Sequence, residues 1–227
     1  MKPQEIRGLW LGLRGGLTIP AMLKIWGRIS SINVRKVIYT AQEIGLAFER
    51  VDAGSEFGIV KTPTYLQRNP NALVPLLEDG EVELWESNVI VRYLCAKHSA
   101  GGLYPLDLPH RFDAERWMDW QQTTLSPAGR TAFIQWFRTP PQQRDMALIE
   151  QSTTATERLM ALLDAHLSRQ PFMAGDRLTM ADIPVACEVH RWQALPQPRP
   201  ERAHLQRWVD ALRARPAARG VFDFPLS

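Results

Sequence analysis

The sequence predicts an α/β domain with a mixed sheet, followed by an all-helical domain. Three observations lead to this fold class. The first hundred residues alternate short apolar runs of strand type with segments of helical period. The pair Asp79-Gly80 lies between two of these runs and is typical of a hairpin turn. After about residue 110 only long segments of helical period remain, so the sheet and most helices are separated along the chain.

The elements of the first part follow from these apolar runs and their stop signals. Asn33 can cap the first helix and Gly45 can end it, because glycine adopts the left-handed conformation without steric cost. Residues 53–73 are rich in glycine, proline and asparagine and read as a loop. The expected elements are strands at 23–27, 48–51, 74–77 and 82–85, helices at 33–44 and 87–97, and a short helix near 63–67.

Prolines delimit the helices of the second part. Pro140-Pro141 ends the first of them and Pro216 the last, since proline lacks the amide hydrogen that a helix needs. The expected helices cover residues 111–138, 142–168, 180–194 and 201–215. We therefore expect an N-terminal extension at 1–21, an α/β domain at 22–100, a linker at 101–109 and a helical domain at 110–227.

The extension has an early lysine and a short apolar run, as a signal peptide does. Arg14 and neighbouring glycines interrupt that run, and Met22 stands directly before the first strand. We interpret residues 1–21 as an upstream extension with Met22 as the functional start. A weak export signal is the alternative.

Composition and charge narrow the class of protein. Hydrophobic residues make up 45% and charged residues 22%, which are ordinary values for a globular chain. The net charge of +3 comes from arginines that are spread out, so we expect no nucleic-acid partner. No run reaches the roughly 18 apolar residues of a membrane span.

Cysteine and histidine usage predicts neither a metal site nor redox chemistry. Cys95 and Cys187 lie in separate apolar helical stretches, and no CxxC or Cys/His ligand spacing occurs. Two buried thiols in a reducing compartment are the expected state, with a disulfide as the alternative. This favours a cytoplasmic protein.

The segment RISSINVRKV, residues 28–37, places two serines and an asparagine at the start of the first helix. A helix N-terminus carries free amide hydrogens and partial positive charge. A hydroxyl there can donate a hydrogen bond to a thiolate and so lower the pKa of that thiol. Ordinary capping of the helix by serine or asparagine is the competing interpretation.

Two further dipeptides suit a ligand. Val74-Pro75 opens a strand and could be a cis peptide, which would turn the Val74 backbone toward a ligand. Glu86-Ser87 stands where a strand turns into a helix, so the Ser87 hydroxyl could bind a carboxylate and Glu86 an ammonium group. A strand-initiating proline and helix capping are the respective alternatives.

A fourth motif, LTMADI at residues 178–183, is interpreted as structural. Thr179 and Asp182 have the spacing of a capping box, and Leu178 and Ile183 that of a hydrophobic staple. We expect this motif to start a buried helix.

The four motifs in this order resemble the glutathione transferase family, over residue 22 to about residue 215. Because of the serine, the chain resembles the cytosolic-type, serine-dependent, bacterial theta-like members of this family. The resemblance implies a thioredoxin-like N-terminal domain that binds glutathione as co-substrate. It also implies an all-helical domain that binds a small hydrophobic electrophile, in a homodimer.

The resemblance further implies residue roles. Ser31 would donate a hydrogen bond to the glutathione sulfur, with Ser30 as the alternative, and Asn33 could assist at the thiol. Val74, held by cis-Pro75, would pair with the cysteinyl backbone. Glu86 and Ser87 would bind the γ-glutamyl ammonium and carboxylate groups. The pocket for the electrophile is expected at Gln121, Leu125 and Phe133.

The chain departs from the family pattern at Leu73, where many members carry Lys, Arg or Gln. The glycine carboxylate of glutathione would then need another partner, for which Arg68 and Lys61 are candidates. Serine instead of cysteine at positions 30 and 31 favours conjugation over thiol exchange. Glutathione-dependent peroxidase, dehalogenase or isomerase activity on the same site is an alternative, as is a non-catalytic interaction module on this fold.

Overall fold

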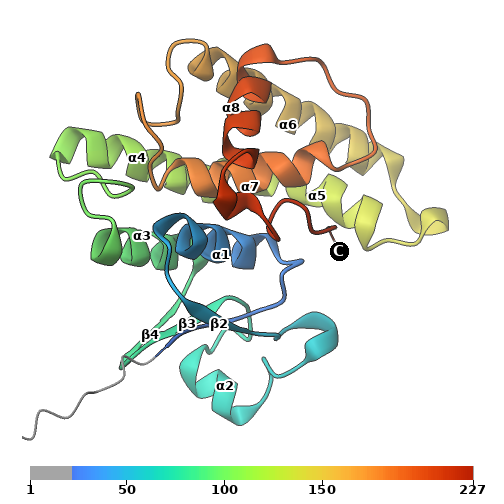
Figure 1. The fold of residues 1–227 in the computed structure, drawn as a ribbon. Coiled ribbons are helices and arrows are strands. Elements are labelled where there is room, and N and C mark those ends of the chain that lie inside the picture. Colours follow the sequence, from blue (N-terminus) through green and yellow to red (C-terminus); the bar gives the residue numbers. More distant parts are fainter. Residues whose placement is uncertain (1–21, 227) are drawn as a thin grey trace, which may run out of the picture.

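The first part of the molecule is built on a four-stranded mixed sheet (Figure 1). The structure, a computed structural model, describes residues 22–226, so the interpretation of 1–21 lies outside the described residues. The strand order is β2-β1-β3-β4, in which β1 and β2 are parallel and the other pairs antiparallel. The strands are β1 (Leu23–Trp26), β2 (Phe48–Val51), β3 (Leu76–Asp79) and β4 (Val82–Trp85).

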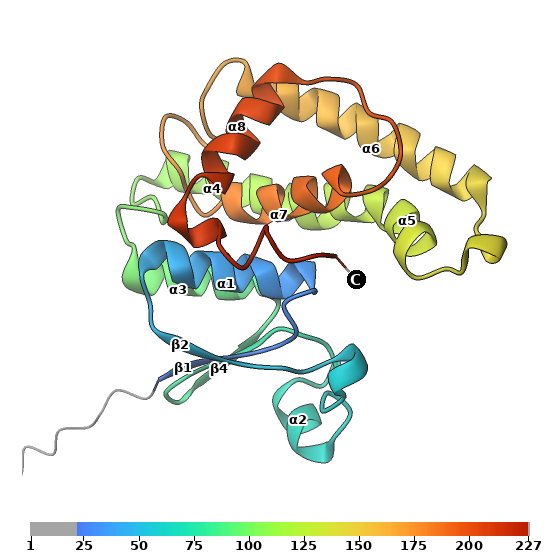
Figure 2. The same ribbon diagram turned by 45° about the vertical axis from the view of Figure 1, so that its right-hand side comes forward.

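Two helices cover one face of this sheet and one covers the other. The helices α1 (Ile32–Ile44) and α3 (Ser87–His98) lie side by side between the sheet and the helical part (Figure 2). The short helix α2 (Pro63–Arg68) lies on the opposite face. This is the thioredoxin-like arrangement that the sequence predicted. The apolar positions of α1 are buried as expected, but residues 34–41 are all buried, including Arg35 and Lys36, because α1 lies between the sheet and the helical part.

The second part is a bundle of helices that packs on α1 and α3 (Figures 1 and 2). Its central helix, α7, contacts α1 directly and is buried along nearly its whole length. The helices are α4 (Leu108–Trp120), α5 (Ser126–Phe137), α6 (Met146–Leu167), α7 (Asp182–Gln193) and α8 (Ala203–Arg213).

The long helix expected at 111–138 forms one unbroken helical run that starts at Leu108. It is not α-helical throughout, because a π-helical segment, Gln121–Leu125, joins α4 to α5. Pro127 lies in the first turn of α5 and has no amide hydrogen to give the preceding turn. A π-helical turn is one way in which a helix accommodates such a break. The next helix starts at Met146 instead of 142 because Asp145 is its N-cap, accepting from the amides of Ala147 and Leu148.

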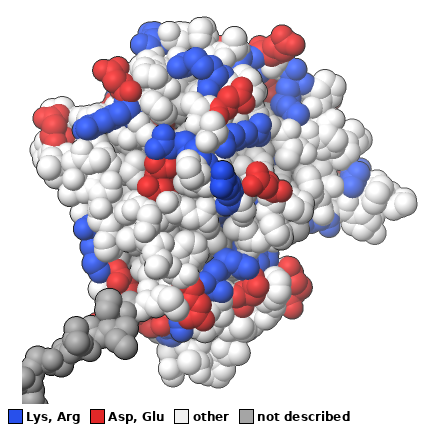
Figure 3. Space-filling model, in the orientation of Figure 1, with Lys and Arg blue, Asp and Glu red and all other residues white. Residues whose placement is uncertain are grey.

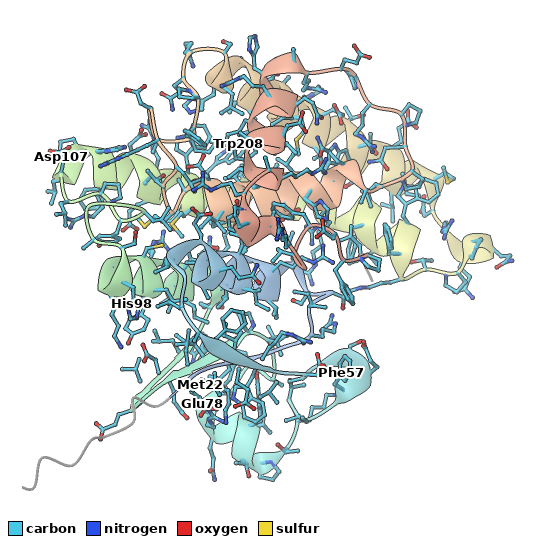
Figure 4. All side chains as sticks on the ribbon, viewed as in Figure 1. Met22, Phe57, Glu78, His98, Asp107 and Trp208 are labelled. Carbon is cyan, nitrogen blue, oxygen red and sulfur yellow. The ribbon has the colours of Figure 1, made fainter. Side chains whose placement is uncertain are left out.

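The LTMADI motif, residues 178–183, fixes the start of α7, as its structural interpretation predicted. Asp182 is fully buried, and its Oδ2 accepts from the Thr179 amide at 2.9 Å, as expected of a capping box. Its Oδ1 accepts from the Met173 amide at 2.8 Å and from the indole of Trp208 at 2.9 Å. Trp208 comes from α8 and is labelled in Figure 4. One carboxylate therefore ties together α7, α8 and the loop before α7.

Both cysteines are free and buried, as expected. Burial raises the pKa of the Cys95 and Cys187 thiols to about 12. We expect a thiol reagent such as Ellman's to titrate neither cysteine in the folded protein and both after denaturation, because reaction needs an accessible thiolate. Two rapidly reacting thiols in the native protein would contradict this burial.

The surface carries charges of both signs. Figure 3 shows Lys and Arg interspersed with Asp and Glu over the displayed face, without a large region of one sign. Among the described residues, no helix is both long and apolar enough to cross a membrane.

Candidate active site

Ser31 stands at the N-terminus of α1 with its hydroxyl uncommitted. It is the N-cap residue, with extended backbone angles (φ −74°, ψ 122°), yet its side chain makes no capping hydrogen bond. Asn33 was expected to cap this helix, but the helix already begins at Ile32, so Asn33 lies inside the first turn and is exposed. The Ser31 hydroxyl therefore lies beside free amide groups and partial positive charge without being used by the helix.

The neighbouring serine differs in accessibility. The Ser30 hydroxyl oxygen is buried and has no hydrogen-bond partner among residues 22–226. As residues, both serines are half-buried and line the same cavity, but the Ser31 hydroxyl is not among the buried oxygen atoms without a partner. Accessibility of the hydroxyl favours Ser31 as the group that meets a bound thiol.

This cavity, of about 350 Å³, lies between the β1–α1 loop and α5. The Val74–Pro75 peptide bond is cis, as the sequence suggested, and Val74 lines the cavity together with the serines. Phe133 lines it from α5, as expected for a residue near the second substrate. We call this space the thiol cavity. Its wall includes Arg28, Ser30, Ser31, Asn33, Gly54, Val74, Ser126, Arg130, Phe133, Ile134, Arg138, Arg191 and Leu226.

A second hollow of about 310 Å³ contains Glu86 and Ser87, and shares Asn33, Ser126 and Arg130 with the thiol cavity. Glu86 is exposed and has a left-handed backbone (φ 73°), which directs the chain from β4 into α3. Together the two hollows form one elongated site that runs from the cis-proline segment past the start of α1 to the start of α3.

Two residues expected around the electrophile lie elsewhere. Leu125 is fully buried in the core and is not part of either wall, so its predicted role is wrong. Gln121 lines the hollow beside Ser87 instead of the thiol cavity. The physical reason is the π-helical segment, which changes the faces that residues 121–125 present relative to one continuous α-helix.

Lys36 was missed by the sequence analysis. It lies on α1 beneath the second hollow and is almost fully buried. Its ammonium group donates to Gln121 Oε1 at 2.9 Å and Asn88 Oδ1 at 3.2 Å, and lies 3.5 Å from the Ser87 hydroxyl. Burial lowers the pKa of Lys36 to about 8. At neutral pH a positive charge therefore lies directly behind Ser87.

Neither candidate for the glycine carboxylate lines the site. Arg68 forms ion pairs with Glu78 at 2.5 Å and Glu83 at 2.6 Å, and stacks over Trp26 on the α2 side of the sheet. Glu78 is labelled in Figure 4 next to α2. Lys61 is absent from both cavity walls.

The C-terminal segment completes the thiol cavity through Leu226. Arg35, fully buried on α1, donates through Nη2 to the carbonyl oxygens of Phe224 at 2.8 Å and Pro225 at 2.7 Å. Its Nε donates to the carbonyl oxygen of Ile29 at 2.9 Å, just before the serines. Arg35 thus fixes the serine loop and the chain end against each other.

No group of His, Cys, Asp or Glu within residues 22–226 is arranged to hold a metal ion. The site instead combines an uncommitted hydroxyl at a helix N-terminus, a cis-proline segment and a buried ammonium group. This combination, on a thioredoxin-like domain joined to a helical bundle, suits a protein that binds an anionic ligand such as a thiolate.

Comparison with known proteins gives the family. The model "Glutathione S-transferase, N-terminal domain" matches residues 21–96, and "Glutathione S-transferase, C-terminal domain" matches residues 123–216. The chain is 43% identical over 209 residues to glutathione S-transferase GstB of Escherichia coli, covering 91% of this chain and 100% of GstB. It is 32% identical over 206 residues to glutathione S-transferase 3 of Zea mays, covering 87% and 91%.

Solved structures agree. The theta class glutathione S-transferase of Xanthomonas axonopodis pv. citri with glutathione bound superposes with a TM-score of 0.88 at 42% identity, covering 92% of this chain and all of that one. Glutathione transferase F7 of Populus trichocarpa superposes with a TM-score of 0.80 at 25% identity, covering 88% and 99%. This chain belongs to the glutathione S-transferase family, as the sequence motifs predicted.

Proposed function

We propose that this protein conjugates the glutathione thiolate to small electrophiles, with the Ser31 hydroxyl stabilising the thiolate. The observation that carries the proposal is the uncommitted Ser31 hydroxyl, which faces a cavity also lined by Val74. The relative from Xanthomonas with glutathione bound supports the choice of thiol. In the reaction the thiol proton goes to solvent, the sulfur forms a bond to the electrophilic carbon, and the leaving group departs with the bonding electrons.

The expected stabilisation of the thiolate is large enough for this role. A free thiol has a pKa near 8.5, and lowering it by about two units requires roughly 2.7 kcal/mol. A hydrogen bond to a charged group contributes about 1.5–3 kcal/mol. The N-terminus of α1 adds about 0.3–1 kcal/mol for a nearby anion. One hydroxyl and one helix end can therefore make the thiolate the main form near neutral pH.

The remaining groups suit the rest of glutathione. The Val74 backbone, beside cis-Pro75, would pair with the cysteinyl residue of glutathione. Asn33 lines the same cavity as Ser31 and could assist at the thiol. Glu86 and Ser87 would bind the γ-glutamyl ammonium and carboxylate groups. The ammonium of Lys36, 3.5 Å from the Ser87 hydroxyl, adds positive charge where that carboxylate would lie.

Replacing Ser87 with alanine is expected to raise KM for glutathione about tenfold or more, because a hydrogen bond to a charged carboxylate is lost. The value of kcat at saturating glutathione should change little, since Ser87 lies away from the thiol cavity. Steady-state kinetics with varied glutathione provide the measurement. Ser168→Ala, at the exposed end of α6, is the matched control. An unchanged KM would exclude Ser87 from glutathione binding.

The function is tested by a spectrophotometric conjugation assay with glutathione and 1-chloro-2,4-dinitrobenzene, together with retention on immobilised glutathione. Turnover above the spontaneous rate supports a transferase. Binding without turnover would redirect the search to peroxides and to dehalogenase or isomerase substrates. Absence of binding would favour a non-catalytic interaction module.

The cellular setting is part of the same proposal. A cytoplasmic homodimer that detoxifies electrophiles is the setting that the family resemblance implies, and the two free, buried thiols are compatible with a reducing compartment. Sedimentation or light scattering of the purified protein would test the dimer.

A further inference from the structure

The thiol cavity has a strongly basic wall. Four arginines line it from three separate parts of the fold: Arg28 follows β1, Arg130 and Arg138 lie on and at the end of α5, and Arg191 is in the last turn of α7. The described residues of this wall include no aspartate or glutamate. Four arginines therefore line a space in which two anionic groups of glutathione, the sulfur and the glycine carboxylate, are expected.

The arginines of α5 face the cavity because of their spacing. Arg130, Ile134 and Arg138 are four residues apart, so they lie on one face of the helix, and all three line the cavity. The guanidinium groups of Arg138 and Arg191 lie 5.1 and 5.0 Å from the centre of the Phe133 ring. Both guanidinium groups thus lie close to the same aromatic ring, which presents an apolar surface beside them.

Most of this charge lacks a protein counter-ion. Arg191 is ion-paired with Glu188. Within residues 22–226, Arg28, Arg130 and Arg138 make no ion pair. Burial, and then repulsion from the other three arginines, lowers the pKa of Arg138. Like charges held together cost free energy, which a bound anion recovers.

Glutathione alone does not account for this wall. Its γ-glutamyl end would lie at Glu86 and Ser87 in the second hollow, leaving the glycine carboxylate and the sulfur for the thiol cavity. Arg28, on the glutathione-binding domain, is placed to meet one of these. Arg130 and Arg138 come from the helical part, the side from which the second substrate would approach the sulfur. Arg130 also lines the hollow of Glu86 and Ser87, whereas Arg138 lines the thiol cavity and not that hollow, so Arg138 is the residue that glutathione accounts for least.

We propose that the preferred second substrate is an electrophile that itself carries an anionic group, such as a carboxylate, bound by Arg138 and Arg130. This inference rests on the proposed transferase function and names its substrate class. The step remains a displacement: the thiolate sulfur bonds to the carbon, and the halide leaves with the electron pair of the broken bond. The arginines offset the repulsion between the two anions and orient the electrophile over Phe133.

The test uses a matched pair of electrophiles, 4-chloro-3,5-dinitrobenzoate and 4-chloro-3,5-dinitrobenzamide, which differ mainly in charge. Arg138→Gln is expected to lower kcat/KM for the benzoate about 10–100-fold, the size of one charge-assisted hydrogen bond, and to change kcat/KM for the amide by less than about threefold. Each comparison is between variant and native enzyme, so the different intrinsic reactivities of the two compounds cancel. KM for glutathione should stay within about twofold.

Two further variants provide a second test and a control. Arg130→Gln removes the second α5 charge and is expected to act in the same direction as Arg138→Gln. Arg158→Gln makes the same change of charge at an exposed position of α6, outside the thiol cavity, and should affect neither electrophile.

The outcomes separate this inference from the proposed function. Equal losses with benzoate and amide, or a raised KM for glutathione with both, would show that the arginines bind glutathione only, which overturns the inference. Turnover of the amide alone would overturn it while leaving the transferase in place. Turnover of neither compound, nor of 1-chloro-2,4-dinitrobenzene, would overturn both.

Discussion

Ser31→Ala is expected to lower kcat/KM for conjugation about 10–100-fold near pH 6.5, through loss of a hydrogen bond to the glutathione thiolate. The substitution leaves the fold nearly intact, because the Ser31 side chain makes no capping hydrogen bond that alanine would lose. We therefore expect an unchanged melting temperature. Steady-state rates across pH, with the spontaneous reaction subtracted, provide the measurement.

The pH dependence distinguishes this role from a positional one. The hydroxyl stabilises the charged form, so the pKa of the bound thiol lies below that of free glutathione in the native enzyme and rises toward about 8.5 in the variant. The loss should be largest below the native pKa and should shrink as pH rises above about 8.5. A loss that is the same at every pH would contradict thiolate stabilisation.

Ser30→Ala is the matched control for this experiment. The Ser30 hydroxyl oxygen is buried and has no partner among the described residues, so its removal is expected to change the rate by less than about threefold. Ser31→Thr, which keeps a hydroxyl, should retain much of the activity. A larger loss in Ser30→Ala than in Ser31→Ala would reassign the thiolate donor to Ser30.

Asp182→Ala is expected to destabilise the protein by about 3–5 kcal/mol, as does removal of one partner from a buried charged network. Without the carboxylate, the amides of Met173 and Thr179 and the indole of Trp208 lose their acceptor in a site that water cannot reach. Burial raises the pKa of Asp182 to about 6, so the group is ionised and accepts from all three donors at pH 7.5. Urea unfolding followed by circular dichroism at that pH measures the loss.

Trp208→Phe serves as the comparison, because it removes one donor and keeps the aromatic ring. It should cost about 1–3 kcal/mol, less than Asp182→Ala. Glutathione binding should survive in both variants under conditions where they are folded, since Asp182 lies outside both hollows of the site. A cost below about 1 kcal/mol for Asp182→Ala would mean that this network does not hold the helical part together.

The elements and their order were predictable from sequence because each has a local signal. The strand at residues 48–51 and that at 82–85 were placed correctly from their apolar runs. Cis-Pro75 and the capping contact of Asp182 to Thr179 were also predicted, since each depends on residues close in sequence. The family followed from the order of these motifs.

Features that depend on distant segments were not predictable in this way. The π-helical turn changed the role of Gln121, because Pro127 allows several local adjustments and tertiary packing selects among them. Lys36 joins the site only through contacts to α3 and to the π-helical segment. The basic wall left one signal in the sequence, the eight-residue spacing of Arg130 and Arg138, which puts both on one face of a helix. Arg28 and Arg191 join the wall only through the fold.

The hydrogen bonds from Arg35 to residues 224 and 225 have a consequence for the evolution and engineering of this enzyme. Arg35 binds the main-chain oxygens of Phe224 and Pro225, which are present whatever side chains occupy those positions. The anchoring of the last residues is therefore largely independent of their identity. Leu226, which follows them and lines the cavity, is partly buried and packs against the hydrophobic core. A substitution at position 226 would therefore change the cavity wall while the main-chain anchor of residues 224 and 225 stays in place.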